Sequence, residues 1–257
     1  MQRSSRVREV LQPVLGALLY APACVGALPS PATLDSAQAQ QRALVAAWPT
    51  VERVAGFKAA FNSPALQQRF GLGRPAFAVL PASAARCAGA ATGCAVSRAG
   101  YKRMVLEIEV ALRLGAAIDA PLADEAALLE RLDGAMPAIE LPELALDGVA
   151  EPGGLDYVAS NIGVRGYILG AVSDPAVLRT AAPRLTLARG ERVVAEGSGG
   201  AALAAALALV NAVVADGYVL RPGQVLLTGA VGGMVPAEPG EYVADCGALG
   251  RLQFTLR

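Results

Sequence analysis

The spacing of apolar and polar residues along this chain predicts several helices. Apolar residues lie along one side of a first helix, at Leu34, Ala37, Leu44 and Val45. Thr33 or Asp35 can cap the start of this helix, and Ser63 followed by Pro64 predicts the cap and first position of a second, short one. Further helices are expected over residues 122–132 and 201–215, and the last is almost wholly apolar and long enough to be buried.

Shorter apolar runs predict strands. They occupy residues 51–61, 105–112, 167–169, 185–187, 192–194 and 225–229, with two last strands before Arg257. The runs at 185–187 and 192–194 form a hairpin about Arg189-Gly190, whereas residues 81–100 are rich in Ala, Gly and Ser and predict a loop. Because helices predominate in the first half and strands in the second, the pattern favours an α+β fold over an array of βαβ units.

The strand at 105–112 carries two acidic residues in an otherwise apolar run. Successive side chains of a strand point to opposite faces, so Glu107 and Glu109 share one face, with their Cα atoms about 7 Å apart. Two carboxylates on a half-buried face need a counter-charge, and Mg²⁺ binds carboxylate oxygens while keeping positions for water or substrate. The alternative is a solvated sheet face without a metal.

A third carboxylate follows in the extended segment Met136 to Pro142. Glu140 lies 31 residues after Glu109, and the helix expected at 122–132 could return the chain to the neighbouring strand. The three carboxylates would then form one face for an octahedral cation with three vacant positions.

Composition narrows the possible chemistry. The chain has 257 residues, 54% of them hydrophobic, and a formal net charge of zero, which suits one large globular domain. It has no basic run, so binding to nucleic acid is not expected. It has no histidine, which excludes Ser-His-Asp catalysis and histidine zinc sites. Acid–base chemistry falls to Asp, Glu, Tyr, Cys or the two lysines, Lys58 and Lys102, and a lysine with a lowered pKa suits such proton transfer.

The first 32 residues differ from the rest. An arginine-rich start precedes an uncharged stretch centred on residues 14–21, and Val25-Gly26-Ala27 offers a small-residue cleavage site. This order is typical of an export signal and linker, which would leave residues 33–257 as a single periplasmic or secreted domain. The stretch is too short to span a membrane stably. The alternative is an N-terminal helix packed on a cytoplasmic protein.

The four cysteines form no Cys-x-x-Cys motif, so a structural zinc site is not expected. Cys87 and Cys94 flank a loop of small residues. They form either a disulfide, which export would favour, or two incidental thiols.

Several segments in a fixed order carry a resemblance to a known family. They are Thr33 to Gln41, Gly56-Phe57-Lys58 with Asn62-Ser63 and Leu66-Gln67, Glu107-Ile108-Glu109, Pro137-Ala138-Ile139-Glu140, Asp156 to Asn161 with Gly166 to Gly170, and Leu226 to Pro236. In these segments the chain resembles the 2-keto-4-pentenoate hydratase and oxalocrotonate decarboxylase group of the fumarylacetoacetate hydrolase superfamily, from about Thr33 to the C-terminus. The last segment is the most specific, because it is long and closely spaced.

The resemblance implies a mixed β-sheet roll with flanking helices, a homo-oligomer, Mg²⁺ or Mn²⁺ as cofactor and a short 2-oxo acid as substrate. It makes Glu107, Glu109 and Glu140 the metal ligands, Lys58 the acid/base group, and Asn161, Thr228 and Gly229 the substrate-binding residues. The implied reaction is hydration of a 2-hydroxy-2,4-dienoate to a 4-hydroxy-2-oxo acid, with Lys58 moving protons while the metal acts as a Lewis acid.

Two segments depart from the family pattern. Pro81-Ala82-Ser83-Ala84 lacks the acidic residue that hydrating members place here, and Ile162-Gly163-Val164-Arg165 replaces a small polar pair. Three functions therefore stay open. They are a hydratase, a 2-oxo acid decarboxylase or acylpyruvate hydrolase on the same scaffold, and a non-catalytic periplasmic binding protein that retains the fold.

Overall fold

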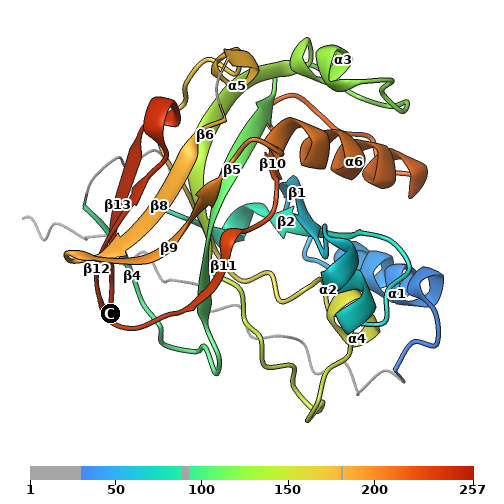
Figure 1. The fold of residues 1–257 in the computed structure, drawn as a ribbon. Helices are drawn as coiled ribbons and strands as arrows, with labels where there is room; N and C mark the ends of the chain where they lie inside the picture. Colours follow the sequence, from blue (N-terminus) through green and yellow to red (C-terminus); the bar gives the residue numbers. More distant parts are fainter. Residues whose placement is uncertain (1–29, 88–92, 181) are drawn as a thin grey trace, which may run out of the picture.

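The structure, a computed structural model, describes residues 30–87, 93–180 and 182–257, and its strands form two sheets (Figure 1). Along the larger sheet the order is β2 (Ala76–Pro81), β1 (Val54–Ala60), β10 (Val225–Leu227), β5 (Val105–Leu114), β6 (Leu132–Glu140), β7 (Tyr167–Leu169) and β3 (Ala85–Arg86), with β11 (Val231–Pro236) also paired to β5. The order in the smaller sheet is β4 (Cys94–Val96), β13 (Arg251–Leu256), β12 (Gly240–Asp245), β8 (Arg184–Arg189) and β9 (Arg192–Ser198).

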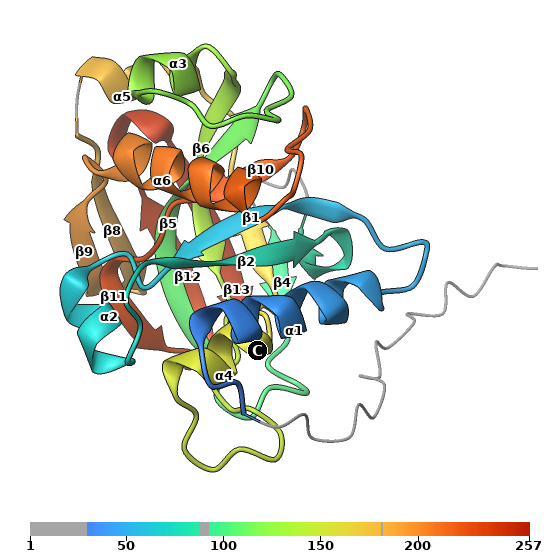
Figure 2. The same cartoon turned by 90° about the vertical axis from the view of Figure 1, so that its right-hand side faces the viewer.

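The helices of the described segments are short apart from two. They are α1 (Leu34–Ala46), α2 (Pro64–Arg69), α3 (Glu125–Leu129), α4 (Gly154–Ala159), α5 (Val177–Thr180) and α6 (Ala202–Ala215), with single 3₁₀ turns η1 (Ala82–Ala84) and η2 (Gly247–Leu249). Figure 2 shows α1 and α4 side by side near β2, and α6 running across β1 and β10. None of these helices is long and apolar enough to cross a membrane.

The larger sheet curls into a roll because its two edge strands are neighbours in the chain. β2 ends at Pro81 and β3 begins at Ala85, and four residues of extended chain span at most about 14 Å. A flat sheet would hold these two strands roughly 29 Å apart, six strand spacings. The sheet therefore bends until its edges approach, and one face becomes the inside of the roll, which confirms the predicted mixed β-sheet roll.

The two faces of the roll bury different clusters of side chains. The inside holds an apolar cluster from β2, η1, β5, β6, β7 and β10, namely Leu80, Ala84, Ala111, Met136, Ala138, Tyr167, Val225 and Leu227. The outside carries the alternate residues of the same strands, such as Ile108 and Val110 of β5. These pack in one cluster with α6 and the smaller sheet. This alternation sets which residues of β5 face the interior of the roll.

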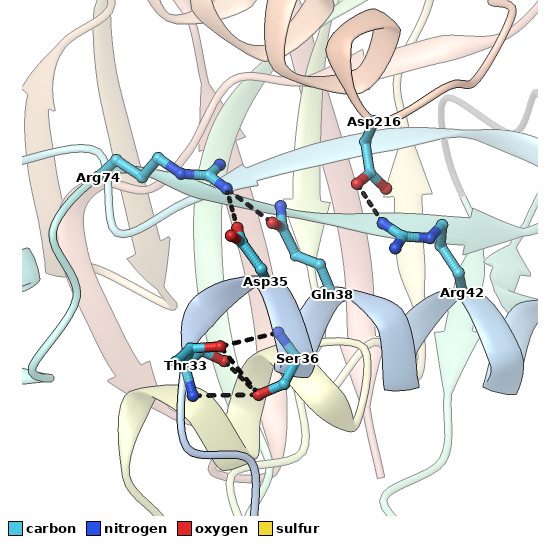
Figure 3. A network of polar contacts seen from close by, with 7 residues as sticks. All are labelled: Thr33, Asp35, Ser36, Gln38, Arg42, Arg74 and Asp216. Carbon is cyan, nitrogen blue, oxygen red and sulfur yellow. Dashed lines mark hydrogen bonds and ion pairs between the residues drawn. The ribbon is translucent and has the colours of Figure 1, made fainter.

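Helix α1 begins where the pattern predicts, and its predicted side packs inward except at Leu44. Thr33 is the N-cap, and its side chain and that of Ser36 satisfy each other's backbone N–H groups. The buried residues are Ala37, Gln38 and Gln41, whereas Leu44 is exposed. Gln41 Nε2 donates to the carbonyl of Phe77 at 2.9 Å. This hydrogen bond orients the helix. Two ion pairs shown in Figure 3, Arg74 with Asp35 and Arg42 with Asp216, also orient it.

Two local predictions were wrong. The segment expected to be a loop, residues 81–100, contains η1, β3 and β4, because β3 and β4 pair with strands distant in the sequence. The helix expected over residues 122–132 is only α3, capped by Asp124, since Leu132 already belongs to β6.

Cys87 and Cys94 form a disulfide that joins β3 of the larger sheet to β4 of the smaller one. The predicted export signal, residues 1–29 of it, lies outside the described residues.

Candidate metal centre and active site

The three acidic residues singled out from the sequence meet inside the roll. β5 and β6 are antiparallel neighbours, with Glu107 directly opposite Glu140 and Glu109 opposite Ala138. One carboxylate oxygen of each glutamate lies within 4.8 Å of the others. The strand period of two and the β5–β6 register together produce this convergence.

Two carboxylates of this cluster are buried and the third is half-buried, and their hydrogen bonding is incomplete. Glu109 and Glu140 are each 1% exposed. Within the described part of the chain, no hydrogen bond reaches Glu109 Oε1 or either oxygen of Glu140, although Glu140 Oε1 lies in an ion pair. Buried carboxylates without donors are costly, and like charges directly opposite on a sheet repel each other. A hard divalent cation requires several carboxylate oxygens close to one another, as they are here, so the residues present fit Mg²⁺ or Mn²⁺.

Two of the carboxyl groups, those of Glu107 and Glu109, have raised pKa values. Burial and the neighbouring Glu140 carboxylate raise the pKa of Glu107 to about 8. Burial, together with the charges of Glu140 and Glu107, raises the pKa of Glu109 well above its ordinary value. Both effects disfavour the ionised form, and a cation among the carboxylates would oppose both.

Lys58 contacts the same cluster from β1. Its strand neighbours are Ala78 of β2 and Leu227 of β10, and the side chain enters the roll with 3% exposure. Nζ lies 2.6 Å from Glu140 Oε1. Burial lowers the pKa of Lys58, but the charges of Glu140 and Glu107 outweigh it and raise the pKa above the ordinary value. The pKa of Lys58 is therefore raised, whereas a lowered pKa was expected of an acid/base lysine. The reason is that three carboxylates face the amine.

Thr228 and Gly229 follow β10 and contact the metal-site strand. The backbone N–H and the hydroxyl of Thr228 both donate to the carbonyl of Val110, at 3.1 and 2.9 Å. The N–H of Gly229 donates to Glu109 Oε2 at 2.7 Å. These two residues therefore lie at the site, and their contact with substrate stays a prediction.

Asn161 is placed differently. Its side-chain oxygen accepts from the N–H of Val79 and its side-chain nitrogen donates to the carbonyl of Val79, both at 2.8 Å. The residue is buried, with a positive φ of 62°. Its amide thus pairs with β2 as a further strand would. Substrate binding by Asn161 stays a prediction.

Sequence reasoning gave no role to Asn62, which lies four residues after Lys58. Its Nδ2 donates to the carbonyl of Thr228 at 3.0 Å. A signal was present, because Asn62 belongs to the same matched segment as Lys58 and precedes the cap of α2. The segment alone could not show which distant residue the amide contacts.

The turn that lacks the expected acid is also defined. Ala84 of η1 faces the inside of the roll with the apolar cluster, and Ser83 is exposed. The N–H of Ser83 donates to Glu52 Oε1 at 3.2 Å, ahead of β1. In the described residues, this turn therefore supplies no carboxylate to the interior.

Comparison with curated proteins identifies close relatives of the chain. It is similar to a 2-keto-4-pentenoate hydratase of Burkholderia vietnamiensis, with 34% identity over 213 residues that cover 80% of this chain and 79% of the relative. It is 31% identical to 2-keto-4-pentenoate hydratase 2 of Dechloromonas aromatica over the same shares. No protein-family model matches the chain.

Solved structures establish the fold. The chain is similar to 4-oxalocrotonate decarboxylase from Pseudomonas putida G7, complexed with magnesium and adipate, with a TM-score of 0.75, 18% identity and coverage of 88% of this chain and 86% of that one. Fumarylpyruvate hydrolase from Pseudomonas aeruginosa, in complex with Mn²⁺ and pyruvate, has a TM-score of 0.57, 17% identity and coverage of 78% and 88%. The roll is thus of the fumarylacetoacetate hydrolase type. Given its identity to the curated hydratases over most of both chains, the protein belongs to the 2-keto-4-pentenoate hydratase family.

Proposed function

We propose that this protein is a metal-dependent hydro-lyase that converts a 2-hydroxy-2,4-dienoate to a 4-hydroxy-2-oxo acid. The observation that carries this proposal is the cluster of three carboxylates, two buried and one half-buried, with the Lys58 amine 2.6 Å from one of them. The curated relatives, which are named for this reaction, support it.

Glu107, Glu109 and Glu140 are the proposed ligands of Mg²⁺ or Mn²⁺. The convergence of one oxygen from each residue supports this assignment, as do the buried oxygens of Glu109 and Glu140 that lack hydrogen-bond donors among the described residues. When bound, the cation would hold the substrate carboxylate and enol oxygen and stabilise the charge on that oxygen as a Lewis acid. The three glutamates carry the charge and orientation that such a cation needs.

Lys58 is the proposed acid/base group. As an ammonium, Nζ would donate a proton to the terminal carbon of the dienoate while the enol becomes a ketone. The resulting amine would take up the enol proton, which restores the ammonium. When water adds at C4, its proton would pass through Nζ to C3, so Lys58 gains and loses no net proton. The apolar residues beside it, among them Ala138 and Leu227, exclude bulk water from this exchange. Thr228 and Gly229 are the proposed wall of the substrate pocket.

A second candidate is a decarboxylase or acylpyruvate hydrolase acting on a 2-oxo acid. The turn at Ala82, Ser83 and Ala84 favours it, because no carboxylate enters the roll there to assist water addition. The third candidate, a binding protein, would keep the metal without turnover.

An absorbance assay separates these functions. The protein is offered 2-hydroxydienoates and acylpyruvates, each with Mg²⁺ and with a chelator. Mg²⁺-dependent consumption of a dienoate, with a 4-hydroxy-2-oxo acid as product, is expected. Consumption of acylpyruvates alone, or release of CO₂, would favour the second candidate. Metal binding without consumption of any compound would favour the third.

We also propose that residues 33–257 form a single catalytic domain, that the chain is exported and cleaved near Leu28, and that the mature protein assembles as a homo-oligomer. The order of charged, apolar and small residues before Leu28 supports export, and family membership supports the domain and the assembly. N-terminal sequencing of natively expressed protein tests the cleavage, and an intact Met1 would favour a cytoplasmic protein. Light scattering gives the oligomeric state.

A further inference from the structure

We infer that Asn62 is a positioning residue for the metal centre, which it orients through the Thr228–Gly229 peptide without touching the ion. This inference rests on the proposed function, since it assigns Asn62 a role toward the ion that Glu109 would bind.

The Thr228–Gly229 peptide is held at both ends. Its carbonyl accepts from Asn62 Nδ2 at 3.0 Å, and its N–H donates to Glu109 Oε2 at 2.7 Å. A hydrogen bond to a carboxylate is stronger than a neutral one, and bonds in series polarise one another. The amide of Asn62 therefore strengthens the donor that fixes Glu109.

The peptide cannot easily shift along β5. Thr228 is tied to the carbonyl of Val110, the residue next to Glu109, by both its N–H and its hydroxyl. Gly229 has a φ of +102°, and a Cβ at this position would lie 2.5 Å from Asn62 Nδ2. Only glycine combines this backbone with so close an approach of the amide.

The backbone before Asn62 is held in an unusual conformation. Phe61 has a φ of +54°, a region that bulky residues rarely occupy. Gln67 Nε2 donates to its carbonyl at 2.9 Å, and its ring lies 5.0 Å from that of Phe70. Strain of this kind persists where surrounding contacts impose it, often near functional sites. Here the contacts come from Gln67 of α2 and from Phe70, which follows α2. They hold Phe61, the residue before Asn62.

The two carboxylate oxygens of Glu109 differ in their hydrogen bonding. Oε2 accepts from Gly229, whereas the buried Oε1 has no hydrogen-bond partner among the described residues. One oxygen thus fixes the side chain and the other is available to a cation. Loss of a residue that orients a metal ligand commonly costs about 10- to 100-fold in metal affinity.

The test measures Mn²⁺ affinity of the full chain by calorimetry and the spectrum of bound Mn²⁺ by electron paramagnetic resonance. N62A removes the amide, and N62L removes the donor while keeping a similar shape. Both variants are expected to bind Mn²⁺ about 10- to 100-fold more weakly, with an altered spectrum. The matched control is N211A on α6. There, Asn211 makes two hydrogen bonds to the backbone of Leu122, on the outer side of the roll. N211A should lower the unfolding temperature and leave Mn²⁺ affinity unchanged.

Unchanged Mn²⁺ affinity in N62L, or an equal loss in N211A, would overturn the inference while leaving the proposed function intact. Loss of affinity in N62L, with no turnover by the unaltered chain, would support the inference and reject the hydratase. If the unaltered chain binds no Mn²⁺, both fail together.

Discussion

Lys58 of β1 and Glu140 of β6 lie 2.6 Å apart, Nζ to Oε1, although β10 and β5 separate their strands in the sheet. In a flat sheet three strand spacings, roughly 14 Å, would keep these residues apart. The curvature of the roll brings the two side chains across its interior. An amine that is distant in both sequence and sheet order thereby contacts the carboxylate cluster.

Replacing Lys58 by methionine should separate catalysis from metal binding. Turnover of the dienoate is expected to fall about 10²- to 10⁴-fold, because the proton carrier is lost. Mn²⁺ affinity should not weaken, since the variant removes a positive charge beside the ligands. Steady-state kinetics and calorimetry measure the two quantities. K102M is the control, because Lys102 pairs with Asp147 at the exposed surface. Equal turnover in K58M and the unaltered chain would remove Lys58 from the mechanism.

Replacing Glu109 by glutamine should abolish measurable Mg²⁺ binding. One of three anionic ligands is lost, and Mg²⁺ gives up its water reluctantly. Titration calorimetry checks this, with E241Q on the exposed side of β12 as the control. A variant that binds Mg²⁺ as tightly as the unaltered chain would contradict the ligand assignment.

The stability of the metal-free protein should depend on pH in a defined direction. The pKa of Glu107 is raised to about 8 in the folded chain, so between its ordinary value of 4.5 and pH 8 the folded state binds more protons than the unfolded one. Stability from this group is therefore fully present below about pH 4.5 and is lost as the pH rises through 8. Urea unfolding in a chelator at pH 5 to 8 measures the slope, which E107Q should flatten. An unchanged slope in E107Q would locate the effect elsewhere.

A related result is expected when metal is added. Because the bound cation requires ionised carboxylates, Mn²⁺ should raise the unfolding temperature more at pH 8 than at pH 5.5. Thermal unfolding at fixed Mn²⁺ concentration checks this, and a stabilisation independent of pH would speak against binding at Glu107 and Glu109.

Replacing Asn161 by alanine should destabilise the fold by about 1–3 kcal/mol, because the buried N–H and carbonyl of Val79 lose their partners. Urea unfolding measures this loss. If stability is unchanged while KM rises, the side chain contacts substrate, as the sequence predicted, and its bonds to β2 matter little.

Removing the disulfide by C87S and C94S together should lower the free energy of unfolding by roughly 2.5 kcal/mol. This value follows from closing a loop with a sequence separation of 7 residues. Unfolding with and without reductant should differ for the unaltered chain and coincide for the variant. A difference that persists in the variant would point to another cause.

Local signals in the sequence predicted local structure well. Thr33 caps α1, Ser63 and Pro64 begin α2, and β8 and β9 meet at Arg189-Gly190. Each of these features depends on residues only a few positions apart, so a short stretch of sequence is enough to predict it. For the same reason, strand alternation alone placed Glu107 and Glu109 on one face.

By itself, then, the sequence determined the caps, the alternation along β5 and the residue types able to bind a cation or carry a proton. Tertiary structure alone decided that Glu140 lies opposite Glu107, that Lys58 meets it across two strands, and that Asn62 contacts the peptide beside Glu109. It also decided that Gln38 and Gln41 are buried beside Ala37 on α1. The reason is that register and curvature arise from pairing between strands, some of which lie more than a hundred residues apart in the sequence. No local pattern encodes which distant strands pair.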